Sequence, residues 1–114
     1  MVALSLARRP LSPAEADEWA HRFKAVADPT RLRLLGLVAA GPDGEACVCD
    51  LTDPVNLSQP TVSHHLRVLV EAGLLTRQQR GRWAYYRTVP AALAALAHVL
   101  DPHRSPPVSP AASR

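Results

Sequence analysis

Residues 57–75, LSQPTVSHHLRVLVEAGLL, carry the pattern from which the fold can be predicted. Ser58 is a preferred helix N-cap residue, Pro60 is tolerated in a first turn, and Gly73 is typical of a helix end, so we expect a helix to about Ala72. At about 100° per residue, the apolar residues fall on one side of this helix. They are Val62, Leu66, Leu69 and Val70. The opposite side carries residues that are polar except for one proline, namely Pro60, Ser63, His64 and Arg67. The helix therefore turns a polar face away from the core.

The segments on either side of this helix predict a helix-turn-helix with a wing. Upstream, residues 47 to about 53 have room for one short helix, because Pro54 disfavours helical geometry in the residue before it. Downstream, residues 75–79 and 83–88 have the composition of strands, and residues 80–82 supply a turn. A short helix, a capped helix with a polar outer face and a hairpin with arginines at its tip form a winged helix-turn-helix.

Two further apolar helices are expected before this unit and one after it. Ser12 and Glu15 form a capping box that begins the first, whose stripe is Ala16, Trp19, Ala20, Phe23 and Ala27. Asp28 caps the second, which is apolar around most of its surface and should be the buried centre; its residues are Leu32, Leu34, Leu35, Leu37 and Val38. Pro90 begins the last, with Leu93, Leu96, Ala97 and Leu100 at helical spacing.

The fold class predicted is mainly α with a small β-hairpin. The first and last helices each carry an apolar stripe that lies outside the helix-turn-helix, and a chain of 114 residues buries both most simply by forming a homodimer. Residues 1–11 are expected to be a flexible leader, residues 12–101 the DNA-binding and dimerisation domain, and residues 102–114 a disordered tail rich in Pro, Ser and Ala. No apolar run approaches the ~20 residues of a membrane span, and no signal peptide is visible. We therefore expect a cytoplasmic protein whose thiols are kept reduced.

Charge is unevenly distributed along the chain, although the net charge is only +3. Residues 13–53 hold four basic and eight acidic side chains, a balance of −4, whereas residues 57–88 hold five arginines and one glutamate, a balance of +4. A basic half on a small chain suggests a polyanionic partner, most commonly nucleic acid. A solvated basic face is the alternative.

Four stretches together resemble the ArsR/SmtB family of metal-responsive repressors, and its arsenic-sensing branch in particular. They are FKAVADPTRLRLLGLV (23–38), EACVCDL (45–51), LSQPTVSHHLRVLVEAGLL (57–75) and RQQRGRWAYYR (77–87). The resemblance implies a homodimeric repressor that binds double-stranded operator DNA and leaves it when arsenite or antimonite binds. It also implies DNA contacts from the recognition helix and the wing tip: Gln59, Thr61, Ser63, His64, Arg67, Arg80 and Arg82. Among these, Arg67 suits base reading, because its guanidinium matches guanine O6 and N7.

Cys47 and Cys49 match the cysteine pair of the family's arsenical site. Thr52 stands where some members carry a third cysteine, so one chain offers no three-cysteine site, and water, a small thiol and the partner subunit remain open as sources of a third ligand. The family's zinc and nickel sites lie on the last helix, and the remnants here, His98, Asp101 and His103, do not complete one. No cofactor is required. The alternative is a regulator that senses cadmium, lead, zinc, oxidants or reactive sulfur through the same thiols.

The spacing of the two cysteines predicts how such a switch operates. Residues two apart in a helix do not face each other, so Cys47 and Cys49 either lie at the frayed start of the third helix or unwind it when they bind one ion. Chelation then distorts the helix-turn-helix, and DNA affinity falls. A disulfide between cysteines this close is expected to be strained and therefore less favourable. The plain alternative is that both are small buried apolar residues.

We expect no enzymatic activity, because the sequence has no nucleotide-binding glycine loop and no hydrolase constellation. A thiol oxidoreductase that uses the Cys-x-Cys pair is one alternative, but no strand-turn-helix platform or general base flanks the pair. A dimeric scaffold with no DNA role is another.

Overall fold

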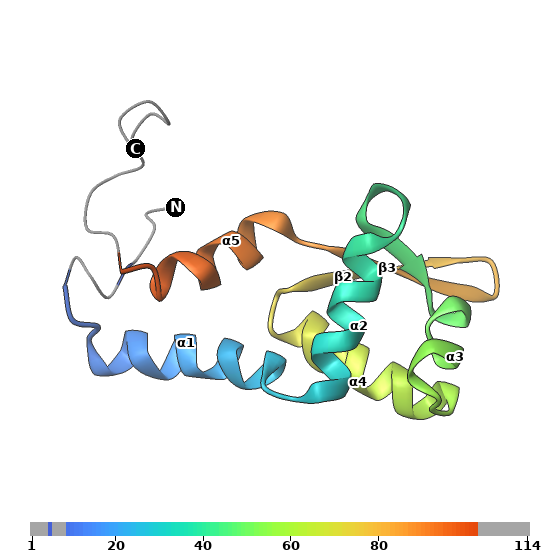
Figure 1. Cartoon of the computed structure of the whole chain (residues 1–114), viewed down its shortest axis with the longest axis horizontal. Coiled ribbons are helices and arrows are strands. Elements are labelled where there is room, and N and C mark those ends of the chain that lie inside the picture. Colours follow the sequence, from blue (N-terminus) through green and yellow to red (C-terminus); the bar gives the residue numbers. More distant parts are fainter. Residues whose placement is uncertain (1–4, 6–8, 103–114) are drawn as a thin grey trace.

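A computed structural model describes the protein at residues 5 and 9–102, and within these residues it has five α-helices and one three-stranded antiparallel sheet (Figure 1). The helices are α1 (Pro13–Val26), α2 (Pro29–Ala40), α3 (Thr52–Val55), α4 (Gln59–Glu71) and α5 (Pro90–Val99). The strands are β1 (Glu45–Cys47), β2 (Leu75–Arg80) and β3 (Trp83–Thr88), in the order β1-β3-β2. Two short 3-10 turns flank β1, η1 (Pro42–Gly44) and η2 (Val48–Asp50).

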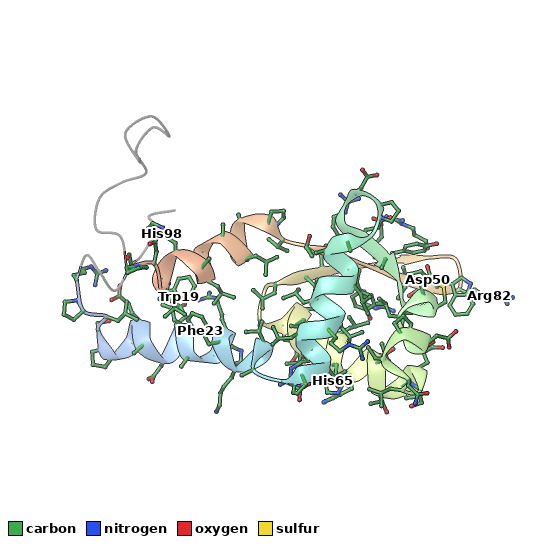
Figure 2. All side chains as sticks on the ribbon, in the orientation of Figure 1. Trp19, Phe23, Asp50, His65, Arg82 and His98 are labelled. Atoms are coloured by element: carbon green, nitrogen blue, oxygen red, sulfur yellow. A yellow bond between two sulfur atoms is a disulfide. The ribbon has the colours of Figure 1, made fainter. Side chains whose placement is uncertain are left out.

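The elements form a winged helix-turn-helix with two outer helices. Figure 1 shows α2, α3, α4 and the sheet gathered at one end, while α1 and α5 run alongside each other at the other end. Trp19 and Phe23 point from α1 toward α5, and Trp19 is 8% exposed (Figure 2). The predicted leader and tail lie largely outside the described residues. Among those that are described, the Ser5 hydroxyl donates to the main-chain oxygen of Asp101 at 3.1 Å.

The core lies between α2, α4 and the sheet. Leu34 and Val38 of α2 and Val62, Leu66 and Leu69 of α4 are all 0% exposed, and each buried aliphatic side chain stabilises the fold by about 1.5–3 kcal/mol. The predicted apolar side of α4 is therefore confirmed. The prediction that α2 is buried around most of its surface is wrong, because Leu32 is 56% exposed. Only one stripe of α2 meets the core, so the remaining leucines are exposed or half-buried.

The caps predicted from the sequence begin the helices where expected. Ser12 Oγ accepts from the Glu15 N–H, and the Glu15 carboxylate accepts from the Ser12 N–H, which completes a capping box. Asp28 caps α2 by accepting from the Arg31 N–H at 3.0 Å, and Ser58 caps α4. Each cap reaches a residue three positions ahead, so local sequence is enough to predict it.

The region predicted as a helix over residues 47–53 is different in the structure. It contains the end of β1, the turn η2 and then α3, which holds Pro54 inside its first turn. A proline is tolerated there because an N–H in the first turn has no intrahelical partner. Asn56, at φ 54°, ends the helix. The predicted hairpin gains β1 as a third strand, because Glu45–Cys47 pairs with β3.

Candidate nucleic-acid interface and cysteine pair

A hollow of about 330 Å³ separates the recognition helix α4 from the hairpin of β2 and β3. Its lining residues are Val48, Gln59, Pro60, Ser63, His64, Arg67, Val70, Arg77, Gln79, Arg82, Ala84 and Tyr86. Arginines come from both walls: Arg67 from α4 and Arg77 from β2. Arg82 comes from the hairpin tip, where Figure 2 labels it. No carboxylate is among these described lining residues. The hollow is therefore a cationic surface suited to a polyanion.

The hollow brings together five of the seven residues predicted to contact DNA: Gln59, Ser63, His64, Arg67 and Arg82. Thr61 is not among them. Its hydroxyl lies 3.0 Å from the Ser58 hydroxyl, and its N–H donates to the same oxygen at 3.4 Å. Thr61 is therefore part of the N-cap of α4, where it helps to fix the start of the helix.

Arg80 lies on the other face of the wing, away from the hollow. Side chains alternate along a strand, so Arg80 points to the side opposite Gln79 and Arg77. Its Nη1 and Nη2 donate to the Glu45 carboxylate at 2.6 and 2.9 Å, and its Nε donates to Gln78 at 2.8 Å. Its guanidinium carbon lies 4.4 Å from the centre of the Tyr85 ring.

Glu45 is the acceptor for two arginines. Arg87 Nη2 donates to it at 3.0 Å, in addition to the two bonds from Arg80. The hydrogen bonds from Arg80, followed by those from Arg87, lower the pKa of Glu45 from 4.5 to about 2. The carboxylate therefore remains charged at neutral pH and holds Arg80 and Arg87, two of the four arginines of the wing.

Three functional candidates were missed from the sequence. Arg77 and Gln79 line the hollow, and the alternation of the strand predicted at residues 75–79 places them on one face. Glu45 gave no local sign of its role, because its partners lie 35 and 42 residues further along the chain.

The recognition helix is also tied to α1 through Arg31 of α2. Arg31 Nε donates to the main-chain oxygen of Ala25 at 2.6 Å, and Nη1 lies 3.2 Å from Nδ1 of His65. Figure 2 shows His65 at the lower edge of the molecule, where α2 and α4 approach each other. His65 is half-buried, unlike His64, which is exposed beside the hollow.

Cys47 and Cys49 lie before the third helix and not within it. Cys47 ends β1 and has extended backbone angles, φ −78° and ψ 144°, while Cys49 lies in the turn η2. The predicted position at the frayed start of the third helix is therefore wrong, because the pair joins a strand to a 3-10 turn that precedes α3. The extended residue turns the chain so that both sulfurs reach the same side, and the Cys49 N–H donates to the Cys47 sulfur at 3.3 Å.

The structure joins the two sulfurs as a disulfide. The Cα atoms of the two cysteines are 5.2 Å apart, within the usual range for disulfides. Cys47 is 3% exposed and Cys49 is exposed, so a ligand reaches the pair from the Cys49 side.

No third protein ligand accompanies the pair among the described residues, where no group of three or more His, Cys, Asp or Glu side chains is placed to hold a metal ion. His98 and Asp101 are described and form no such group, and His103 lies outside the described residues. In the same part of the chain, no helix has both the length and the apolar character needed to cross a membrane.

Comparison with known proteins assigns the family. The family model described as "Bacterial regulatory protein, arsR family" matches residues 28–77. The solved structure of the AntR antimony-specific transcriptional repressor is 36% identical, has a TM-score of 0.66, and the match covers 79% of this chain and 80% of that one. This chain belongs to the arsR family. The family consists of regulatory proteins and is not a class of enzymes.

Two further arsR-related proteins bear on function. The arsenic resistance transcriptional regulator ArsR1 of Pseudomonas putida is 50% identical over 68 residues, which is 60% of this chain and 52% of that regulator. The chain thus spans about half the length of that relative. The homodimeric winged helix-turn-helix DNA-binding domain Mb0332 from Mycobacterium bovis is 28% identical, with a TM-score of 0.64 and coverage of 78% and 83%.

Proposed function

We propose that this protein is a metalloid-responsive repressor that binds operator DNA as a homodimer and is released when arsenite or antimonite binds Cys47 and Cys49. One observation carries the proposal. Val48, the residue between the two cysteines, is 2% exposed and lines the hollow between the recognition helix and the wing. The two cysteines therefore flank a residue of the hollow's wall, although neither of them lines the hollow.

The cationic hollow supports the DNA-binding half of this proposal. Arg77 and Arg82 suit phosphate oxygens, which hold the protein on the duplex, while Arg67 on the recognition helix suits a guanine edge. Gln59, Ser63 and His64 add hydrogen-bonding groups on the same helix face. The relatives named above as transcriptional regulators support the same assignment.

Exposed apolar residues on the two outer helices support the homodimer. Ala16 and Ala20 of α1 and Ala97 of α5 are exposed, and Leu100 is 60% exposed just after α5. They extend the same stripes that bury Trp19 and Leu96. A second copy covers these surfaces in a closed, symmetric assembly, as the homodimeric relative suggests.

The chemistry of the thiol pair supports the choice of inducer. Arsenous acid, As(OH)₃, exchanges two hydroxides for two thiolates: each thiol gives its proton to a departing hydroxide, and two waters leave. The arsenic then retains one hydroxide or takes a small thiol in its place. Soft sulfur donors favour soft ions. The reaction requires free thiols, so the disulfide form must be reduced before it can bind arsenite.

Release from DNA requires that the inducer bind the free protein more tightly than the DNA-bound protein. The backbone between Cys47 and Cys49 connects β1 to η2 and leads into α3, the first helix of the helix-turn-helix. Holding both sulfurs on one arsenic fixes that backbone and Val48 in a single arrangement. We infer that DNA favours a different one.

The experiment that tests the proposal begins with a duplex selected by the reduced wild-type protein from a random pool. Arsenite, antimonite, cadmium and zinc are then titrated onto the complex in reducing buffer. We expect arsenite and antimonite to release the wild-type protein and to leave Cys47→Ser and Cys49→Ser bound. Ser12→Ala, which changes a distant cap, serves as the matched control and should be released normally. Release of both cysteine variants by arsenite rules out the proposed switch.

A further inference from the structure

We propose that Glu45 is the positioning residue through which the cysteine pair acts on the wing, the hairpin of β2 and β3. The inference rests on the proposed function, because it names the path from ligand capture to weaker DNA binding. Glu45 lies outside the hollow, and its carboxylate holds Arg80 and Arg87 of the wing.

The clamp made by Glu45 joins two parts of the chain that are remote in sequence. Its carboxylate accepts three hydrogen bonds, at 2.6 and 2.9 Å from Arg80 and at 3.0 Å from Arg87. The Glu45 side chain is 19% exposed, against 40% for Arg80. Isolated surface ion pairs contribute little, but a bidentate pair on a shared, mostly covered carboxylate fixes geometry as well as charge.

Strand β1 also contacts the wing at a second position. In the ladder, Glu45 lies opposite Arg87 and Cys47 lies opposite Tyr85. The Arg80 guanidinium packs on the Tyr85 ring, so it touches the residue opposite Cys47 as well as the Glu45 carboxylate. Because β1 is only three residues long, a movement of Cys47 reaches Glu45 directly.

The described conformation contains both the paired sulfurs and the hydrogen bonds between Glu45 and Arg80. The sulfurs of Cys47 and Cys49 are joined, and at the same time Arg80 is held on the face of the wing that points away from the hollow. Joined sulfurs and a withdrawn Arg80 are thus compatible in one structure. Arg80 Nη1 and Nη2 cannot use the same N–H groups for Glu45 and for a DNA phosphate. We infer that a ligand held by both sulfurs favours the clamped wing, whereas DNA favours the wing with Arg80 released to a phosphate.

A direct test compares arsenite-induced release in Glu45→Gln, Arg80→Gln and the double variant, using the selected duplex in reducing buffer. For wild type we expect arsenite to lower DNA affinity by about 5–150-fold. In each single variant arsenite should lower DNA affinity by less than about threefold. The double variant should show the same residual effect as either single variant, because the effects of two substitutions that remove one contact are not additive. Because coupling is reciprocal, the arsenite affinity of the free protein should fall by no more than the factor that is lost from release.

Glu15→Gln is the matched control. Glu15 forms a second bidentate pair, with Arg9 at 2.9 and 2.8 Å, beside the start of α1 and far from the wing. Its loss removes the same charge and the same kind of clamp, so the arsenite effect should remain that of wild type. The inference is overturned if arsenite lowers the DNA affinity of Glu45→Gln as much as that of wild type, or if Glu15→Gln loses as much of the arsenite effect as Glu45→Gln. Either result leaves the proposed function standing.

A second measurement separates the two proposals if arsenite fails to release wild type from DNA. Trp83 lies opposite Arg80 at the end of the hairpin and is 39% exposed. In a Trp19→Phe background it is the single tryptophan. Arsenite should shift its emission in the free protein, and Glu45→Gln should abolish the shift. If arsenite leaves the Trp83 emission unchanged in Trp19→Phe protein that retains Glu45, the link between the cysteines and the wing is overturned. If arsenite shifts the emission but does not release DNA, only the proposed function is overturned.

Discussion

Replacing Arg82 with glutamine tests the assignment of the hollow as the DNA surface. Arg67, Arg77 and Arg82 line the hollow in each protomer, so a homodimer brings six arginines to one duplex. If each neutralises a phosphate, the logarithm of the binding constant falls by about 5 per tenfold rise in salt, since each contact contributes about 0.9. The variant Arg82→Gln removes two contacts per dimer and should flatten this slope by about two units.

The assay for Arg82→Gln is a fluorescence-anisotropy titration of the selected duplex at several salt concentrations. Lys24→Gln is the control, because Lys24 lies on α1 outside the hollow and carries the same charge. It should leave the slope near the wild-type value. A mixed pool of duplexes should be affected by Arg82→Gln as much as the selected one, because phosphate contacts carry no sequence information. An unchanged slope for Arg82→Gln, or equal flattening by Lys24→Gln, would refute the placement of DNA in the hollow.

Two further predictions concern assembly and pH. Leu100→Glu should yield monomers in sedimentation. The side chain is 60% exposed in one chain, so a charge there leaves the fold of the monomer intact but is costly to bury in a dimer interface. A dimer of unchanged affinity would place the interface elsewhere. Stability to urea should be highest above pH 4.5 and fall toward pH 2, because Arg80 and Arg9 lower the pKa values of Glu45 and Glu15 to about 2 from 4.5, so the unfolded chain takes up protons first. Glu45→Gln should flatten that dependence at fixed protein concentration, and a full wild-type slope would contradict the clamp.

Local sequence was enough to predict where α1, α2 and α4 begin and five of the residues that line the hollow. Ser12, Asp28 and Ser58 each cap through a backbone N–H three residues ahead, so the start of each helix is a property of a short segment. The period of α4 placed Leu66 in the core and Arg67 outside it, as observed. These features depend on contacts between near neighbours in the chain, which the sequence displays directly.

Only tertiary contacts fix the backbone that leads to Cys47 and the partners of Glu45. The segment from Glu45 to Cys47 is a strand because β3, about 40 residues later, offers it a free edge; only Cys47 of this segment lies within the helix predicted at residues 47–53. That pairing extends the backbone at Cys47 and brings its sulfur to Cys49, and it places Glu45 beside Arg80 and Arg87. Partners at such separations meet only after the chain has closed a long loop. The local sequence pattern does not predict these partners, because the free energy that stabilises their contacts comes from the whole assembled core.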